Sequence, residues 1–469
     1  MNIAIIHYHL KPGGVTNVIK HQVETLSGLF NVCLLTGELP DAPICENTIL
    51  VPELGYTDAS TPFLDIEKLA DAISEILSLA FGGTCDLIHI HNPLLAKNRH
   101  FLTLLKLLQC KGHTLFLQIH DFAEDGRVSA YYANEPYLAN CHYGVINSRD
   151  YHLLIQAGLK PAGLHLLPNT IEPIFLERAT SATQNRILYP VRAIRRKNIG
   201  EILLLSLFFK ENIFSITLPP NSPSDMKSYN GWKEFSIHNN LDVEFESGLN
   251  KDFHTLIASS ESIVSSSITE GFGFSFLEPW TADKLLWGRS IPYICIDFQK
   301  NGIFLDHLYQ SLNVPISWIG EDALINAWMP CISNTADTFN IKINKEDTHN
   351  YFLSKIKSGI IDFGFLDEIF QKQVISQVLS SKENQDMLKR FNPYLKEPYY
   401  IGNKTKLITH NKKAILQNYN KKKYKKNLTK MYHTIINHPV KHSINKKILA
   451  SHFLRPDNFS LLKWSNYVE

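Results

Sequence analysis

Two carboxylates lie eight positions apart on either side of a glycine-rich turn. Glu270 begins the run Glu-Gly-Phe-Gly-Phe-Ser-Phe-Leu-Glu and Glu278 ends it. The apolar, small-residue segment 263–268 ahead of the run predicts a strand, which places Glu270 at its carboxyl end. A glycine-rich turn between a strand and a helix can bind phosphate through backbone N–H groups and the helix dipole. Glu278, on the helix, could then accept hydrogen bonds from sugar hydroxyls.

A basic stretch occupies the end of another predicted strand, 186–191. Arg192 and Lys197 are its outermost cations, with two further arginines between them. A diphosphate leaving group carries concentrated negative charge, and charge-assisted contacts from Arg and Lys stabilise it while the bond to it breaks. The stretch is therefore a candidate site for a diphosphate.

Two further candidates lie in the first half of the chain. Gly13 and Gly14 follow the predicted strand 2–8 and open a helix, where paired glycines let a ligand approach the backbone closely. His120 ends the predicted strand 113–120. Both are weaker signals than the glutamate motif when taken alone.

A polar loop follows His120 and is a candidate to face a second substrate. Its residues Asp121, Glu124 and Arg127 offer charges of both signs. Other histidines nearby, His89 and His91, are expected to be cleft-lining or hydrogen-bonded strand residues. No third and fourth ligand at a recognisable spacing supports a zinc site.

The elements that would position these residues follow an α/β pattern. Short apolar runs alternate with amphipathic segments of helical length, which is typical of parallel sheets covered by helices. The pattern restarts near residue 186, so two Rossmann-like units joined near 172–185 are expected. Strands are predicted at 2–8, 31–36, 86–91, 113–120, 143–147, 163–167, 186–191, 214–218, 243–247, 262–268 and 292–297. Helices are predicted at 66–79, 98–110, 366–379 and 411–436.

The predicted domains are an N-terminal Rossmann-like domain at 1–175, a C-terminal one at 176–400, and a lysine-rich helical closing segment and tail at 401–469. With 469 residues the chain is too long for a single core. Residues 401–450 contain thirteen lysines and no acid. Their centre, Lys421–Lys426, suggests either a solvated helix face or a contact with anionic membrane.

Bulk composition favours a cytoplasmic globular protein, with peripheral membrane contact as an addition. The seven cysteines form no Cys-x-x-Cys pair, the net charge is only +2, and no apolar run is long enough to cross a bilayer. The N-terminus lacks the features of a signal peptide. No nucleic-acid partner is expected.

The glutamate motif resembles the signature of retaining glycosyltransferases of the large GT-B family 4. The resemblance spans roughly residues 1–310 and 410–436. It implies that Glu270 lies beside the donor sugar and that Glu278 binds the ribose of the nucleotide. It also implies that the backbone of Gly273 and Phe274 lies beside the sugar donor.

The same resemblance gives roles to the other candidates. Arg192 and Lys197 fall on the family's arginine and lysine that contact the diphosphate, although Pro190-Val191 stands where Val-Gly is usual. Gly13 and Gly14 match a Gly-Gly loop that faces the donor phosphate. His120 matches a histidine that contacts the donor sugar. The implied fold is GT-B, with two Rossmann-like domains facing a central cleft and a C-terminal helical extension.

The activity implied is retaining transfer of a hexose from a UDP- or GDP-linked sugar to an acceptor that the sequence does not identify. The chain has no Asp-x-Asp pair, and Arg192 and Lys197 can supply positive charge, so no metal or cofactor is expected. The alternatives are another enzyme on this scaffold, such as a phosphorylase or epimerase, a non-catalytic nucleotide-sugar-binding protein, and a membrane-surface-binding protein.

Overall fold

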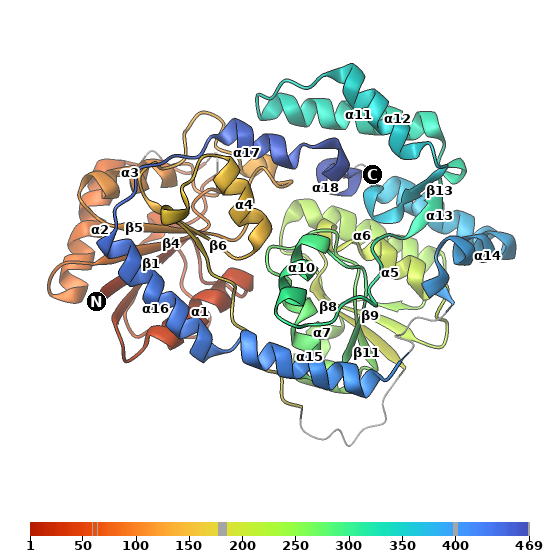
Figure 1. Ribbon diagram of the computed structural model, residues 1–469, viewed down its shortest axis with the longest axis horizontal. Helices are drawn as coiled ribbons and strands as arrows, with labels where there is room; N and C mark the ends of the chain where they lie inside the picture. Colours follow the sequence, from red (N-terminus) through yellow and green to blue (C-terminus); the bar gives the residue numbers. More distant parts are fainter. Residues whose placement is uncertain (59, 63, 177–184, 397–401, 468–469) are drawn as a thin grey trace. The chain divides into compact units, whose positions relative to one another are not determined.

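A computed structural model describes the whole chain except residues 59, 63, 177–184, 397–401 and 468–469. The chain forms two compact units, coloured along the sequence in Figure 1. Part of the expected joining segment, 177–184, lies outside the described residues. Unit 1 comprises Met1–Thr170, Thr338–Ile341 and Tyr419–Phe453, and unit 2 comprises Ile171–Asp337, Lys342–Asn418 and Leu454–Glu469.

Unit 1 is built on a seven-stranded parallel sheet in the order β3-β2-β1-β4-β5-β6-β7. Its central strands are buried along their length because helices cover a parallel sheet on both faces. The strands are β1 Asn2–His7, β2 Asn31–Thr36, β3 Thr48–Leu50, β4 Leu87–His91, β5 Leu115–Ile119, β6 His142–Val145 and β7 Leu164–Leu166.

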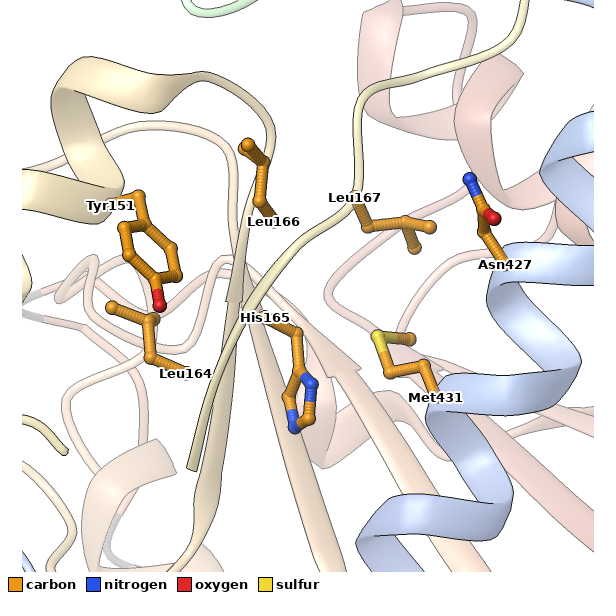
Figure 2. Close-up of a pocket in the computed structure, with 7 residues that line it drawn as sticks. All are labelled: Tyr151, Leu164, His165, Leu166, Leu167, Asn427 and Met431. Atoms are coloured by element: carbon orange, nitrogen blue, oxygen red, sulfur yellow. The ribbon is translucent and has the colours of Figure 1, made fainter. Parts of the chain in front are cut away.

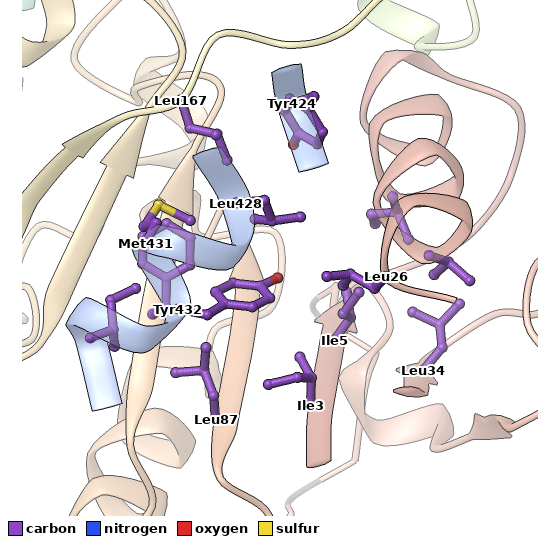
Figure 3. Close-up of a cluster of buried hydrophobic side chains, with 14 of the residues drawn as sticks. Ile3, Ile5, Leu26, Leu34, Leu87, Leu167, Tyr424, Leu428, Met431 and Tyr432 are labelled. Carbon is purple, nitrogen blue, oxygen red and sulfur yellow. The ribbon is translucent and has the colours of Figure 1, made fainter. Parts of the chain in front are cut away.

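A helix from near the C-terminus completes the core of unit 1. Helix α16 (Lys421–Asn437) lies beside α1 (Gly14–Leu26). Figure 3 shows its apolar face, including Leu428 and Tyr432, packed against side chains of β1 and β4 such as Ile3 and Leu87. The other helices of unit 1 are α2 Ile66–Phe81, α3 Phe101–Cys110, α4 Ser148–Gln156 and α17 Lys446–Phe453.

Unit 2 contains a five-stranded parallel sheet in the order β10-β9-β8-β11-β12. Its strands are β8 Arg186–Arg192, β9 Ile213–Leu218, β10 Val243–Glu244, β11 Ser262–Ser265 and β12 Leu285–Gly288. Its helices up to residue 300 are α5 Ile199–Ser206, α6 Pro223–His238, α7 Ser247–Asn250, α8 Phe253–Ser259, α9 Glu278–Thr281 and α10 Pro292–Lys300. The two parallel α/β sheets expected from the sequence are therefore confirmed.

Two element predictions were wrong. Segment 292–297, expected as a strand, is helix α10, and the edge strand is β12 instead. Pro292 stands at the first helical position, where its missing N–H costs nothing, whereas in a strand it would remove a ladder hydrogen bond.

The single helix expected at 411–436 is two helices. Helix α15 (Lys404–Asn418) ends before Tyr419, and Asn420 caps α16 by accepting a hydrogen bond from the backbone N–H of Lys423. Leu416, near the end of α15, is 37% exposed because the break removes it from the register of the apolar face of α16.

The region beyond residue 300 is mostly helical. It holds α11 Glu321–Thr338, α12 Lys345–Ile356, α13 Glu368–Ser380, α14 Lys382–Phe391, α18 Leu461–Trp464 and the antiparallel pair β13 Asn313–Pro315 and β14 Ile360–Asp362. Among the described residues, no helix combines the length and the apolar character needed to span a bilayer.

Candidate functional site

The glutamate motif of unit 2 begins just beyond the end of β11. Glu270 is 8% exposed, and its backbone is held at both polar groups by one side chain. The Tyr293 hydroxyl accepts a hydrogen bond from the Glu270 N–H at 3.0 Å and lies 2.8 Å from the Glu270 carbonyl oxygen, to which it donates. Tyr293 belongs to α10, so the misassigned segment contributes directly to the position of the motif.

Glu270 forms an ion pair with Lys197, one of the two cations predicted to bind a diphosphate. Burial alone would raise the pKa of Glu270, but the charges of Lys197 and Arg196 outweigh it and hold that pKa below its usual value. Both side chains are largely buried, at 14% exposure for Lys197 and 9% for Glu270. The structure therefore brings two predicted site residues from separate motifs together as charged groups.

The cations of the basic stretch have different partners in the structure, and the sequence alone could not distinguish them. Arg192, at the end of β8, donates to the Pro219 carbonyl at 3.0 Å and to the Asn221 side chain. Arg195 instead forms a two-fold ion pair with the buried carboxylate of Glu368, at 2.5 and 2.6 Å. Arg195 thus links α13 to this turn, while the partners of Arg192 among the described residues are neutral oxygens.

The turn after Glu270 continues into a short 3₁₀ turn and not directly into a long helix. Gly273 adopts a φ of 86°, and a Cβ there would meet the Ile294 side chain at 2.9 Å, so the fold itself requires glycine. Phe274 begins the 3₁₀ turn, and its ring lies 5.0 Å from that of Phe272. The helix dipole available for a phosphate is therefore smaller than the sequence suggested.

Glu278 begins α9, a helix of only four residues. Burial raises the pKa of its carboxyl group to about 7. Within the described part of the chain, no side-chain hydrogen bond to this carboxyl group is found. Hydroxyl groups of a ligand would therefore find an acceptor there that the protein does not already occupy.

In unit 1 the paired glycines open α1 as expected. Gly13 is the N-cap residue in an extended conformation, and Gly14 is the first helical residue. A Cβ at Gly14 would meet nothing within 4 Å, and one at Gly13 would meet only a carbonyl oxygen at 3.8 Å. In contrast to Gly273, the fold of the free protein does not require glycine at either position.

His120 follows β5 and is buried, with 6% exposure. Its backbone N–H donates to the Asn92 side chain at 2.7 Å, and its Nε2 lies 2.8 Å from Nδ1 of His91. Burial lowers the pKa of His120 to about 4, so its ring is neutral at pH 7. His89 and His91 are hydrogen-bonded strand residues, which was one of the two expectations, and both are fully buried.

The polar loop after His120 divides into partly exposed and buried parts. Asp121 and Arg127 form an ion pair of 2.7 Å near the surface. Glu124 is fully buried, accepts a hydrogen bond from Tyr137 at 2.9 Å, and has its pKa raised to about 7 by burial. Glu124, given above as a candidate to face a second substrate, is therefore a buried group and not an exposed loop charge.

One cavity of unit 1 contains none of the predicted site residues. Figure 2 shows this space, of about 340 Å³, between β7 and α16. Its lining is mostly apolar and comprises Tyr151, Leu164, His165, Leu166, Leu167, Asn427 and Met431. It adds nothing to the chemistry of the two candidate regions.

Two positioning residues carried no signal that singled them out in the sequence. Tyr293 holds the backbone of Glu270, and Asn92 accepts from the backbone N–H groups of both His120 and Asp121. Asn92 has a φ of 52°, a left-handed conformation that asparagine tolerates better than most residues. Its place directly after the strand residue His91 was the available hint.

No family model matches the chain. The chain is 27% identical over 424 residues to the mannosylglucosyl-3-phosphoglycerate synthase of Petrotoga mobilis. The matched region covers 79% of this chain and 80% of that protein.

Solved structures share the fold at lower identity. A sucrose-phosphate synthase from Thermosynechococcus elongatus matches with a TM-score of 0.56 at 14% identity, over 92% of this chain and 98% of its own. HepE from Anabaena, solved with UDP and glucose, matches with a TM-score of 0.52 at 11% identity, over 92% and 99%. The GT-B fold expected from the sequence is confirmed.

Proposed function

Because the chain is a GT-B glycosyltransferase related to members of family 4, we propose that it transfers a hexose with retention, from a UDP- or GDP-linked sugar, without a metal ion. The observation that carries the proposal is the buried pair of Lys197 and Glu270 beside the glycine turn. In the proposed reaction, Lys197 and Arg192 stabilise the departing diphosphate, and Glu270 lies beside the sugar.

The other candidates complete the proposed sugar-donor site. The Glu278 carboxyl group has no protein partner among the described residues and would bind the ribose. Gly273 and Phe274 offer backbone to the sugar. Gly13 and Gly14 need not be glycine for the fold alone, which supports close approach of a ligand to that turn. His120 would contact the sugar through its ring.

The acceptor is proposed by analogy with the relative from Petrotoga mobilis. The name of that protein describes a product in which sugars are attached to 3-phosphoglycerate. A small phosphorylated acid, free or already glycosylated, is therefore the first acceptor class to test. Asp121 and Arg127 are the partly exposed charged candidates for its contact, whereas burial of Glu124 argues against a direct role for that residue.

The test is a screen of UDP- and GDP-sugars for binding, for slow hydrolysis, and for transfer to phosphorylated acids. Native protein is compared with Glu270→Ala, Arg192→Ala and the exposed control Glu234→Ala. We expect one sugar donor to bind, and the first two substitutions to suppress turnover while the control does not. Turnover abolished by removing divalent cations would overturn the metal-independent part. Binding without release or transfer of sugar would favour a non-catalytic sugar-nucleotide-binding protein.

A second proposed partner is an anionic membrane surface. Lys422, Lys423 and Lys426 lie on the exposed side of α16, opposite its buried apolar face, while Lys421 pairs with Glu24 at 2.9 Å. Each exposed lysine near a negatively charged bilayer adds about 1 kcal/mol of attraction. We expect salt-sensitive pelleting with phosphatidylserine vesicles that is lost when the three exposed lysines are changed to glutamine. Equal pelleting of the changed protein would exclude this contact.

A further inference from the structure

His120 is the end of a buried hydrogen-bond network in unit 1. Its ring bonds to His91, and His91 Nε2 lies 3.0 Å from Oε1 of Gln22 on α1. The Gln22 amide nitrogen then donates to the Tyr424 hydroxyl on α16 at 2.9 Å. Every link lies inside unit 1, and Gln22 and His91 are fully buried.

A second branch of the network orients the Gln22 amide. The same amide nitrogen donates to Oε1 of Gln118 at 2.9 Å, and this oxygen also accepts from His89 Nε2 at 2.9 Å. His89 Nδ1 lies 2.7 Å from the hydroxyl of Tyr432, which donates to it. Figure 3 shows Tyr424 and Tyr432 on the side of α16 that faces the sheet.

The direction of the hydrogen bonds determines where the protons lie. An amide oxygen can only accept, so Gln22 Oε1 requires the proton of His91 on Nε2. Burial holds the pKa of His91 well below its usual value, so the ring is neutral and its Nδ1 can only accept. With the two amides oriented as in this structure, His120 carries its own proton on Nε2, which leaves Nδ1 as an acceptor. No protein partner of His120 Nδ1 is found among the described residues.

We propose that Gln22 and Tyr424 are positioning residues that hold His120 in its Nε2–H tautomer, so that Nδ1 accepts a hydrogen bond from a hydroxyl of the bound sugar. This inference rests on the proposed function, because it takes His120 as a contact of the sugar donor. It adds a chemical preference: the sugar must present a hydroxyl at this point. A carboxylate or carbonyl oxygen there would meet a lone pair and be disfavoured.

Reversing one amide alone breaks the network. Turning Gln22 by itself would set its N–H groups against His91 Nε2–H and its oxygen against the Gln118 oxygen. Only a joint reversal of Gln22 and Gln118 pairs the links again, and it would also give partners to the Gln118 amide nitrogen, which has none among the described residues. That alternative moves the His120 proton to Nδ1, so the two settings can be told apart by experiment.

The first measurement is ¹⁵N NMR of the full chain labelled at histidine, with His120 assigned through His120→Asn. We expect a neutral His120 ring protonated at Nε2 in the native protein, and a mixture of tautomers in Gln22→Met. A native His120 protonated at Nδ1, or an unchanged tautomer in Gln22→Met, would overturn the inference. No substrate is needed, so this measurement stands even if the proposed function fails.

The second measurement compares the turnover of Gln22→Met with that of two tyrosine variants, each of which lacks a single oxygen. Tyr424→Phe removes the hydroxyl that Gln22 binds, and Tyr432→Phe makes the same change on the same helix, on the branch more remote from His120. We expect kcat to fall about tenfold in Gln22→Met, roughly one hydrogen bond in free energy, and about threefold in Tyr424→Phe, with KM changed less than about twofold.

Tyr432→Phe should lower kcat less than Tyr424→Phe does. Equal effects of the two tyrosine changes, or losses that appear only as lower thermal stability, would mean that the hydroxyls merely support the core. If Gln22→Met does not fold, the two tyrosine variants carry the test together with the tautomer of His120. A sugar donor lacking the contacted hydroxyl should be insensitive to Tyr424→Phe, and equal sensitivity would overturn the hydroxyl contact.

Discussion

In unit 1 the candidate residue His120 is neutral, and a chain of amide and imidazole hydrogen bonds holds it. In unit 2 the candidates Glu270 and Lys197 are charged and hold each other. Burial explains the difference, because it drives histidine toward its neutral form, whereas a carboxylate can stay charged only beside a cation. The two candidate regions should therefore respond differently to substitution and to acid.

The largest effect is expected from breaking the charged pair. Glu270→Gln removes the carboxylate that is paired with the largely buried Lys197, which should cost about 3 kcal/mol of unfolding free energy, and should lower turnover about a thousand-fold if Glu270 lies beside the reacting sugar. Denaturant unfolding and single-turnover kinetics measure the two losses. The double variant Lys197→Met, Glu270→Gln should regain much of the stability and none of the turnover. A double variant as unstable as the single one would show that the pair does not act as a unit.

The next largest effect is expected from acid, which should lower the stability of unit 1 before that of unit 2. His7, His89, His91 and His120 have pKa values lowered by burial, to about 3 for His7 and His89, so the unfolded chain binds more protons below about pH 6.5. Their contribution to stability is complete above that pH and is lost as pH falls toward 4. From pH 7 to 5.5 the four histidines together lose about 5 kcal/mol, and the raised pKa of Glu124 returns about 1.6 kcal/mol, so these five groups leave unit 1 about 3 kcal/mol less stable.

The ion pair of Glu270 and Lys197 should keep its contribution to stability over this pH range. Because the pKa of Glu270 is lowered, that contribution is lost only as pH falls below about 4.5. Hydrogen exchange followed by mass spectrometry, comparing peptides of β4 and β5 with peptides of β8 and β11, checks the order. Loss of protection first in unit 2 would contradict the electrostatic contrast.

The smallest effect concerns the glycines. Gly273→Ala forces a side chain into a left-handed conformation against Ile294 and should destabilise unit 2 by about 1–2 kcal/mol. Gly14→Ala should change stability by less than about 0.5 kcal/mol, because its Cβ meets open space, yet should raise KM for the sugar donor. Thermal unfolding with steady-state kinetics measures both. An unchanged KM in Gly14→Ala would remove that turn from the proposed site.

The parts of the fold that follow from local pattern could be predicted. The buried strands such as 31–36, the glycine-opened helix after β1 and the two parallel sheets all follow from hydrophobic period and turn residues. Segment 292–297 was predicted wrongly because its alternating apolar residues suit both a strand and a half-buried helix. Pro292 was the signal that favoured the helix. The short edge strand β12 depends on its neighbour β11, which no local pattern reveals.

Motif spacing identified the candidates but not their partners. Arg192, Arg195 and Lys197 have similar local signals, and only the positions of Glu368 and Glu270 distinguish them. Likewise, nothing near Gln22 in the sequence indicates Tyr424, about four hundred positions away. Such pairs arise from tertiary packing and must be observed.

The place of α16 in unit 1 has a consequence for synthesis on the ribosome. The first strand emerges early, but Tyr424, Leu428 and Tyr432, which close its core, emerge only after nearly all of unit 2 has been translated. Until then the apolar face formed by Ile3, Ile5 and Leu87 lacks its cover. The nascent chain therefore carries an unfinished first unit through most of elongation, a state in which chaperones would be expected to bind.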